Sequence, residues 1–139
     1  MTNDMNDFNN SVIEEFRSNQ GETTGMFAGK PLLLLSTTGA KSGQTRVNPL
    51  MFLQDGDRWL VFASKAGAPT NPDWYHNVRA NADVTVEIGA ESFEATATEV
   101  TGEERDELFA RQVEAYPNFG EYQEKTTRKI PVVALNRKG

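Results

Sequence analysis

One segment of the chain, residues 37–46, combines the residue types that proteins use to bind anions. It reads Thr-Thr-Gly-Ala-Lys-Ser-Gly-Gln-Thr-Arg and lies between two runs that are typical of strands. Gly39 and Gly43 can adopt a positive φ at little steric cost, so successive backbone N–H groups can turn toward one point. Lys41 and Arg46 would add positive charge there. The pattern predicts a site for a phosphate or a carboxylate, with an ordinary loop that carries a solvated Lys and Arg as the alternative.

A second glycine-rich turn, residues 63–69, reads Ala-Ser-Lys-Ala-Gly-Ala-Pro. If both turns open at the same end of a barrel, Ser64, Lys65 and the backbone donors would surround a flat ligand. The strand between the two turns would supply an apolar wall formed by Pro49, Leu50 and Met51. This arrangement suits a flavin-like ring, and the alternative is that the residues form only a tight turn.

Three aromatic residues follow near the end of the chain: Tyr116, Phe119 and Tyr122. Glu121 and Glu124 accompany them, so we expect these rings to be only partly buried. A partly buried aromatic cluster favours a substrate pocket, although the same rings could simply close the core.

Other common catalytic patterns are absent from the sequence. His76 is the only histidine and there is no cysteine, so we expect no bound metal. A single histidine beside Trp74 and Tyr75 indicates a helix-surface or packing residue, with a catalytic role as the alternative. No serine lies in a Gly-x-Ser-x-Gly motif, and the Walker A and Rossmann glycine patterns are missing.

The composition limits the classes of protein to consider. A chain of 139 residues fits one domain with a buried core. The formal net charge of -6 argues against nucleic acid as a partner, because binding to a phosphate backbone needs a basic surface. No apolar run approaches the ~20 residues that span a bilayer. The absence of a signal sequence predicts a cytoplasmic protein.

The periodicity of apolar residues predicts the elements that must position these side chains. A short N-terminal helix is expected from the stripe Phe8, Val12, Ile13 and Phe16. This stripe could cover the core or lie on a membrane, and the acidic polar face of the helix favours the core. Three glycines within residues 18–29 predict a flexible connection, which could act as a hinge or a lid. We therefore divide the chain into an N-terminal segment, residues 1–28, and a barrel domain, residues 29–139.

Short apolar runs separated by turn residues predict six strands: 32–36, 47–54, 58–63, 83–88, 92–100 and 130–135. Asp55-Gly56 is a strong hairpin signal. Three further helices are expected: one capped by Asn71 with Pro72 in its first turn, one that opens with a Thr101–Glu104 capping box, and one over residues 118–127. Short strands in hairpin order with few helices indicate a mainly β (α+β) fold built on a small antiparallel barrel.

Three segments taken together resemble the deazaflavin-dependent nitroreductase family of actinobacteria, whose members use the coenzyme F420. They are residues 31–51, which contain Leu-Ser-Thr-Thr-Gly-Ala-Lys-Ser-Gly-Gln-Thr-Arg-Val-Asn-Pro, residues 63–77, which contain Pro-Asp-Trp-Tyr-His-Asn, and residues 122–131, Tyr-Gln-Glu-Lys-Thr-Thr-Arg-Lys-Ile-Pro. The resemblance implies a split β-barrel of the flavin-reductase and pyridoxamine-phosphate-oxidase type, which agrees with the strand pattern.

The resemblance also implies roles for individual residues. Lys41 and Arg46 would meet the phosphate and the acidic oligoglutamate tail of the coenzyme. Ser64 and Tyr122 would be the catalytic side chains. The coenzyme cleft would be completed by Pro49, Leu50, Met51, Ala63, Ser64, Lys65, Ala66, Gly67, Pro69, Trp74, Tyr75 and Asn77. The substrate pocket would be lined by Tyr116, Phe119 and Tyr122.

By this resemblance the protein is an oxidoreductase that transfers a hydride from reduced F420 to a small-molecule electron acceptor, a quinone or a nitroaromatic compound. Phe119 stands where the best-known nitroreductase of the family has a tyrosine, so one hydrogen bond to substrate is lost and reduction of nitroimidazoles is not implied. Two other functions would fit the same cleft: a non-catalytic carrier of a flavin, deazaflavin or lipid, and an FMN-dependent reductase. A homodimer and weak contact with the inner face of the plasma membrane are further expectations.

Overall fold

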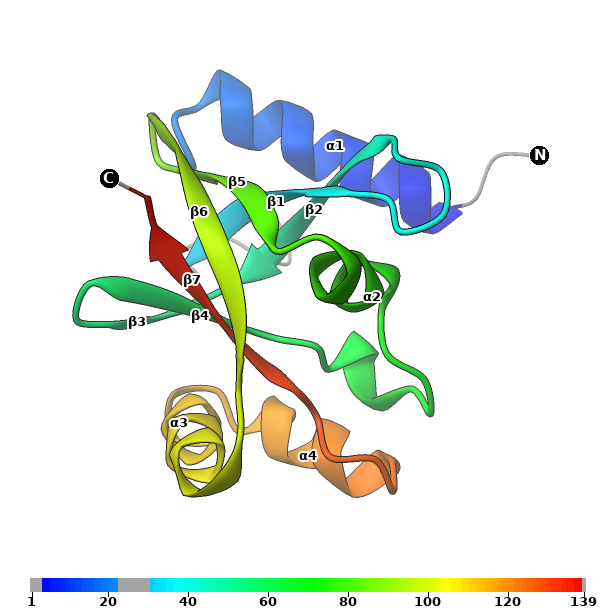
Figure 1. Ribbon diagram of the computed structural model, residues 1–139, viewed down its shortest axis with the longest axis vertical. Helices are drawn as coiled ribbons and strands as arrows, with labels where there is room; N and C mark the ends of the chain where they lie inside the picture. The colour runs from blue at the N-terminus through cyan, green and yellow to red at the C-terminus, as the bar shows by residue number, and fades with distance from the viewer. Residues whose placement is uncertain (1–3, 23–30, 139) are drawn as a thin grey trace.

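The computed structural model describes residues 4–22 and 31–138 of the chain (Figure 1). Within this part, seven strands form one sheet: β1 (Leu32–Thr38), β2 (Thr45–Met51), β3 (Leu53–Asp55), β4 (Arg58–Phe62), β5 (Asp83–Ile88), β6 (Glu91–Val100) and β7 (Val132–Arg137). The described helices are α1 (Asp4–Ser18), the short 3-10 helix η2 (Lys65–Gly67), α2 (Asp73–Ala80), α3 (Gly102–Ala115) and α4 (Asn118–Lys125). Most of the connection expected over residues 18–29, and the boundary at residue 28, lie outside the described residues.

The sheet curls into a small barrel because its two edge strands are consecutive in the chain. The hydrogen-bonded order is β2-β1-β5-β6-β7-β4-β3, and every neighbouring pair is antiparallel. β2 and β3 stand at opposite ends of this order, yet Phe52 alone separates them in the chain. The chain bend at Phe52 therefore brings the two edges of the sheet together.

The prediction of one unbroken strand over residues 47–54 is wrong. The first part of this run pairs with β1, where Leu50 lies opposite Leu33, and the second part pairs with β4, where Leu53 lies opposite Leu60. A bend at a single apolar residue does not interrupt the apolar pattern, so the sequence alone showed no break. The other predicted strands are confirmed within a few residues at their ends.

Alternating side chains of the strands fill the barrel interior. On β6, Phe93, Ala95 and Ala97 are buried as predicted. They pack in one cluster with Val61 of β4 and with apolar residues of β1, β5 and β7. Trp74, Tyr75 and Val78 of α2 join this cluster, so α2 is anchored to the barrel by its buried face. Figure 1 shows α2 between the β1–β2 turn above it and η2 below it.

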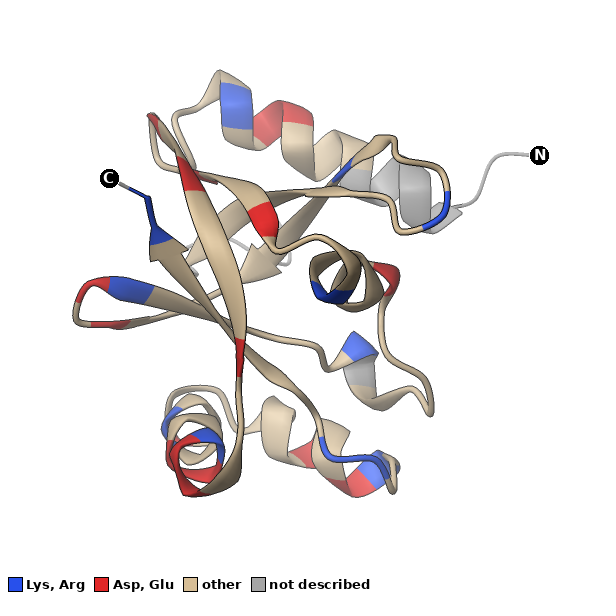
Figure 2. Ribbon diagram, in the orientation of Figure 1, with Lys and Arg blue, Asp and Glu red and all other residues tan. Residues whose placement is uncertain are grey.

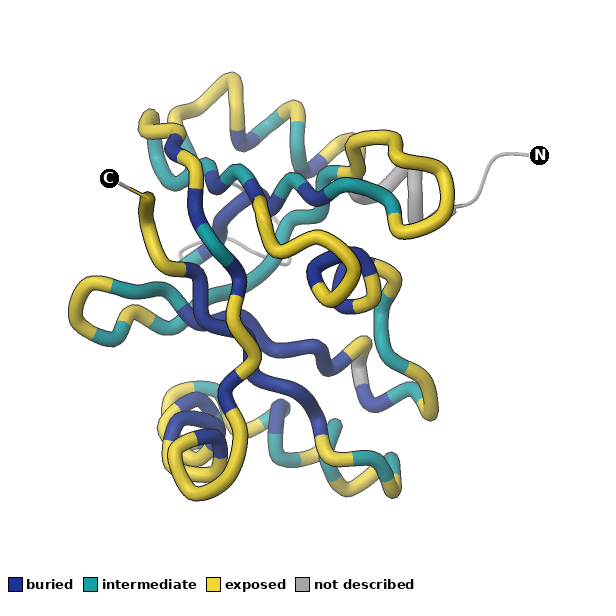
Figure 3. The backbone as a smooth tube through the Cα atoms, in the orientation of Figure 1, coloured by how far each residue is buried: buried dark blue, intermediate teal, exposed yellow. Residues whose placement is uncertain are grey.

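Helices cover the outer side of the barrel at two places. Figure 3 shows the buried parts of these helices in dark blue, on the sides that face the strands. Val12 and Phe16 of α1 pack with Leu32 and Leu34 of β1. This packing confirms that the apolar stripe of α1 covers the core; the side chain of Phe8 lies outside the described part. α3 and α4 cover β4 and β7 in a further cluster formed by Leu60, Phe62, Val100, Leu108, Phe109, Phe119, Ile130, Val132 and Ala134.

Two predicted helix starts are corrected. Pro72 occupies the N-cap of α2 and not its first turn, and the Asn71 side chain, expected to cap, accepts a hydrogen bond from Arg128. Thr101 is the N-cap of α3 as predicted, but no side-chain cap bond forms there. The carboxylate of Glu104 pairs instead with the Arg58 guanidinium, 2.9 Å away, so the capping box is not made.

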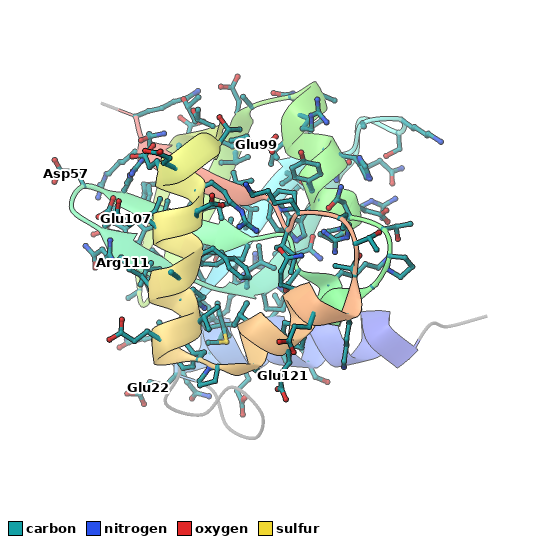
Figure 4. The ribbon with its side chains drawn as sticks, turned by 90° about the horizontal axis from the view of Figure 1, so that it is seen from below. Glu22, Asp57, Glu99, Glu107, Arg111 and Glu121 are labelled. Carbon is teal, nitrogen blue, oxygen red and sulfur yellow. The ribbon has the colours of Figure 1, made fainter. Side chains whose placement is uncertain are left out.

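Charged side chains also tie α3 to the β3–β4 hairpin. Arg111, which Figure 4 labels on the side of α3 nearest the hairpin, donates to Asp55 at 3.0 Å. Arg58 donates to the same carboxylate, and these two guanidinium groups lower the pKa of Asp55. No helix in residues 4–22 and 31–138 is long and apolar enough to cross a membrane.

Candidate functional site

A groove of about 1220 Å³ opens beside the β1–β2 turn, residues 37–46. It is bounded by α1, by this turn with the start of β2, and by α2. Pockets that hold drug-sized ligands have volumes of about 300–1,000 Å³, so this groove can take an extended ligand. The structure thus places the segment singled out in the sequence on the wall of a groove.

Positive charge dominates this groove. Lys41 and Arg46 are exposed, and neither forms an ion pair with a carboxylate among the described residues. Arg17 of α1 also lines the groove, but Glu87 holds its guanidinium through contacts of 2.8 and 3.1 Å. Among the described lining residues, Asp73 carries the only carboxylate. Figure 2 accordingly shows blue segments and no red on the β1–β2 turn.

The backbone of the β1–β2 turn differs from the prediction. Gly43 has a φ of +72°, but Gly39 does not adopt a positive φ. A Cβ on Gly39 would lie 2.6 Å from Oγ of Ser42 and 3.2 Å from the carbonyl oxygen of Gln44, so close approach and not φ disfavours a side chain there. The N–H groups of both glycines donate to carbonyls of the turn itself, at 2.7 and 2.9 Å. These two groups are therefore not free for an anion, and the positive charge of the turn comes from its side chains.

Asn77 of α2 fixes the β1–β2 turn to the barrel. Its Oδ1 accepts a hydrogen bond from the N–H of Ala40 at 2.9 Å, and its Nδ2 donates to Oγ1 of Thr37 at 3.1 Å. Asn77 and Thr37 are buried, so water does not compete well for these bonds. The amide of Asn77 thus determines where Lys41 stands, and direct contact of Asn77 with the coenzyme stays a prediction.

The β4–α2 loop, residues 63–72, is held by a side chain that our sequence reasoning did not select. The Arg128 guanidinium donates to the carbonyls of Ala63, Ser64 and Ala68 at 3.0, 2.8 and 3.0 Å, and to Oδ1 of Asn71 at 2.6 Å. Arg128 lies in the third segment that carried the family resemblance, and this was the only signal that pointed to it.

The other side of this loop packs against α4. Gly67 of η2 has a φ of +83°, and a Cβ there would lie 2.8 Å from the carbonyl oxygen of Tyr122 and 3.0 Å from Cβ of Lys125. Ser64 is the N-cap of η2 and is 9% exposed. The structure therefore brings the loop that carries Ser64 against the helix that carries Tyr122, and the catalytic role of these two residues stays a prediction.

The three aromatic residues of the predicted substrate pocket are not equivalent. Tyr116 and Tyr122 are half-buried, as expected. Phe119 is only 6% exposed, so the expectation of partial exposure is wrong for this ring. It packs edge-on against Phe62 and Tyr122, with ring centroids 5.8 and 5.4 Å apart. Phe119 thus supports Tyr122 from inside the core, and its contact with substrate stays a prediction.

The expected apolar wall of β2 is not one surface, because neighbouring residues of a strand point to opposite sides. Leu50 packs against the interior cluster, whereas Met51 packs against the clusters under α1 and under α3 and α4. Pro49 is half-buried. No single ring can contact all three side chains from one side, although each remains a predicted coenzyme contact.

The remaining predicted cleft residues divide by exposure. Trp74 and Tyr75 are buried in the interior, where the Tyr75 hydroxyl donates to Glu99 at 2.8 Å and burial together with this carboxylate raises the pKa of Tyr75. Lys65 and Pro69 are exposed. His76 is exposed at the groove, in agreement with a helix-surface residue. The side chain of Ala66 is outside the described part.

The barrel is matched by proteins of low sequence identity, which show the fold alone. A putative pyridoxamine 5'-phosphate oxidase from Listeria innocua superposes with a TM-score of 0.58 at 12% identity, covering 94% of this chain and 93% of that one. The predicted split β-barrel of the pyridoxamine-phosphate-oxidase type is thereby confirmed.

Closer relatives identify the family. The family model of F420H(2)-dependent quinone reductases matches residues 10–137. The F420H(2)-dependent quinone reductase Rv1261c of Mycobacterium tuberculosis strain H37Rv is 43% identical over 111 residues, which are 78% of this chain and 74% of that protein. A solved F420-H2 dependent reductase, FDR-A, is 46% identical with a TM-score of 0.70, over 76% of this chain and 94% of its own. A further structure, described as a domain-swapped dimer, is 40% identical with a TM-score of 0.73, over 96% and 98% of the two chains.

The chain therefore belongs to the F420H(2)-dependent quinone reductase family. It is an oxidoreductase whose reductant is F420H2 and whose acceptor is a quinone, as the resemblance implied. Family membership favours this activity over the carrier and over the FMN-dependent reductase.

Proposed function

We propose that this protein reduces a quinone with the anionic part of F420H2 held in the groove by Lys41 and Arg46. The observation that carries the proposal is a pair of exposed cations that have no carboxylate partner within residues 4–22 and 31–138, in a groove of about 1220 Å³. Two unit charges at 4 Å attract by about 1 kcal/mol in water and several times more near a protein surface. Two such contacts supply a useful fraction of the affinity for an anionic coenzyme.

The residue types in the groove fit the chemistry of this coenzyme. A phosphate and a carboxylate tail need cations and hydrogen-bond donors, which are the groups that Lys41 and Arg46 supply. The groove continues along α1 and α2, so an extended tail has room. A compact ligand without a tail would leave part of this cationic surface unused.

The reacting part of the site lies, in this proposal, along the β4–α2 loop and α4. Bound F420H2 supplies the hydride, and the protein supplies the position. The Tyr122 hydroxyl accepts a hydrogen bond from Nδ2 of Asn118 at 3.0 Å, so its own proton is free to be donated. Ser64 offers a second hydroxyl. Either group can stabilise negative charge on the acceptor oxygen or give it a proton.

A quinone suits this part of the site better than a strongly polar acceptor. Tyr116 and Tyr122 are half-buried rings against which a flat apolar ring can stack, and their hydroxyls can meet the quinone oxygens. A nitroaromatic ring shares the flat shape and the electron-poor character, so it is the second acceptor that we propose.

The direct test mixes the protein with F420H2 and a soluble quinone such as menadione and follows the return of deazaflavin absorbance. We expect reoxidation that depends on both protein and quinone, and slower reoxidation with a nitroaromatic acceptor. Binding of F420H2 without reoxidation by either acceptor would favour the carrier. Turnover with reduced FMN at the same rate would contradict the tail site.

A homodimer and weak contact with the inner membrane face are finer proposals. A relative of 40% identity is described as a domain-swapped dimer, which supports testing the oligomeric state by light scattering. The apolar side chains described within residues 10–18 of α1 pack on the barrel, so this part of the helix offers little apolar surface to lipid. Flotation with anionic vesicles tests the membrane contact, and a soluble fraction unchanged by vesicles would exclude it.

A further inference from the structure

We propose that Arg128 is a positioning residue for the reaction: its guanidinium sets the shape of the β4–α2 loop and thereby the place of Ser64 relative to Tyr122. The inference rests on the proposed function in one respect, namely that this loop holds the reacting part of the coenzyme. What it adds is a role in the reaction for Arg128, which was described above only as the side chain that holds this loop.

The contacts of Arg128 reach both ends of the loop. Nε donates to the Ala68 carbonyl, Nη1 to the Ala63 carbonyl and to Asn71, and Nη2 to the Ser64 carbonyl, all between 2.6 and 3.0 Å. A guanidinium has five N–H donors in a rigid planar fork. Four of them are used here on one loop, so a single side chain joins the first residues of the loop to Asn71, two positions before α2.

The role of Arg128 is not that of an ion-pair partner. Among the described residues no carboxylate pairs with it, and its partners are three backbone carbonyls and an amide oxygen. Burial lowers the pKa of Arg128, yet a guanidinium stays protonated in proteins. The Arg128 charge is only partly buried, and its hydrogen-bond partners on the protein all lie on one loop, so these bonds hold the loop in one shape.

The backbone of the loop needs such a hold. Lys65 has a φ of +47°, a backbone conformation that residues other than glycine rarely adopt. Strained residues of this kind persist only where the surroundings fix them. In a trans peptide the N–H and the C=O point in opposite directions. Because the guanidinium binds the carbonyls of Ala63 and Ser64, the N–H groups of the next residues, Ser64 and Lys65, face away from it. Arg128 thus directs two backbone donors as well as the Ser64 side chain.

Arg128 is itself fixed to the helix of Tyr122. Nε2 of Gln123 donates to the Arg128 carbonyl at 2.7 Å, and Oε1 of Gln123 accepts from the N–H of Ile130 at 3.0 Å. Arg105 of α3 donates to the same Oε1 and to the Ile130 carbonyl. The β4–α2 loop and α4 are therefore both hydrogen-bonded to the same short segment, residues 128–130.

The test compares Arg128→Lys and Arg128→Gln with Arg137→Lys, the same substitution at an exposed arginine that pairs with Glu91. The first readout is trypsin cleavage after Lys65 in the protein without coenzyme, measured by mass spectrometry relative to cleavage after the exposed Lys41. The second is kcat and KM with F420H2 and menadione, and the third is Tm.

We expect Arg128→Lys to raise relative cleavage after Lys65 about tenfold and to lower kcat on the order of 100-fold, the cost typical of a small misplacement at a reacting centre. The KM for menadione should change much less, and Arg137→Lys should resemble the natural protein in every readout. Gln123→Glu provides a milder variant if the Arg128 variants fold poorly, because it removes the donor to the Arg128 carbonyl and keeps the acceptor for Ile130 and Arg105.

Unchanged cleavage after Lys65 would overturn the inference, because Arg128 would then not hold the loop. Increased cleavage with natural kcat would also overturn it, since the loop would then not position the reaction. The proposed function fails in a different way: the natural protein would then show no coenzyme-dependent turnover at all, while the cleavage readout would still report on Arg128.

Discussion

The β1–β2 turn and the β4–α2 loop flank the same helix, α2, but the turn is exposed and lightly held, whereas the loop is fixed by several contacts. The β1–β2 turn presents Lys41 and Arg46 to solvent and is tied to α2 by the amide of Asn77. The β4–α2 loop is gripped by Arg128 and packed against α4. An exposed flexible cation can follow an anionic tail, whereas a reacting centre needs a fixed frame. We therefore expect changes in the turn to alter affinity and changes in the loop to alter turnover.

The largest effect should come from Gly67→Ala in the loop, compared with Gly43→Ala in the turn. Both glycines have positive φ, +83° and +72°, which costs an alanine about 1–2 kcal/mol. At Gly43 nothing lies within 4 Å of the new Cβ, whereas at Gly67 the Tyr122 carbonyl oxygen is 2.8 Å away. Displacing this contact adds about 1–3 kcal/mol of overpacking.

Urea unfolding measures the free energy of unfolding of both variants, and steady-state kinetics measures their kcat. We expect Gly67→Ala to lose more stability than Gly43→Ala and to lose kcat as well. Equal losses of stability would show that η2 moves off α4 without cost, and the loop would then not be the rigid half of the site.

The next effect is expected from Asn77→Ala, which tests the support that α2 gives to the turn. It removes the partner of the N–H of Ala40, an exposed residue, and of the buried Thr37 hydroxyl, and a buried polar group left unpaired costs about 1–3 kcal/mol. The dissociation constant of F420H2 should rise because Lys41 is no longer held at the groove. Asn81→Ala, an exposed position at the end of α2, serves as the control. Natural coenzyme affinity in Asn77→Ala would show that the turn needs no support.

The two regions also differ in how well the sequence predicted them. The turn was identified from its own residues, because glycines and cations between two strands are a local pattern that indicates an anion site. Its internal geometry was not predictable: the role of Gly39 depends on close approach to Ser42, and that of Asn77 on a contact with residues far away in the chain.

The loop was also singled out by its own glycine-rich sequence, but Arg128, the residue that holds it, was not. Its acceptors lie about 60 residues away in the chain, at separations of 57 to 65 positions, and no local pattern encodes such a contact. Strand positions and the inward face of β6 were predictable from alternation. The bend at Phe52 was not, because apolar residues continue through it while their pairing partner changes from β1 to β4.

A smaller effect is expected from Lys41→Ala, which removes charge from the turn without disturbing its fold. We expect about a tenfold rise in the dissociation constant of F420H2, equivalent to about 1.4 kcal/mol, with kcat at saturation unchanged. Added salt should reduce the difference from the natural protein, because salt screens exposed charges. Lys138→Ala, which removes an exposed lysine paired with Asp83, is the matched control. A fall in kcat without a change in affinity would reverse the roles of turn and loop.

The smallest effect is expected from Asn71→Ala, which removes one of the four acceptors of Arg128 and leaves the three carbonyls in place. Net hydrogen-bond contributions of about 0.5–1.5 kcal/mol predict a loss of kcat of a few fold. Asn71→Asp keeps the acceptor and gives it a charge, and charge-assisted hydrogen bonds are stronger than neutral ones, so this variant should retain kcat. Steady-state kinetics of the two variants separates the acceptor from the size of the side chain. If both variants lose kcat equally, the neutral amide of Asn71 acts through its shape or its own donors, and the grip of Arg128 must come from the carbonyls alone.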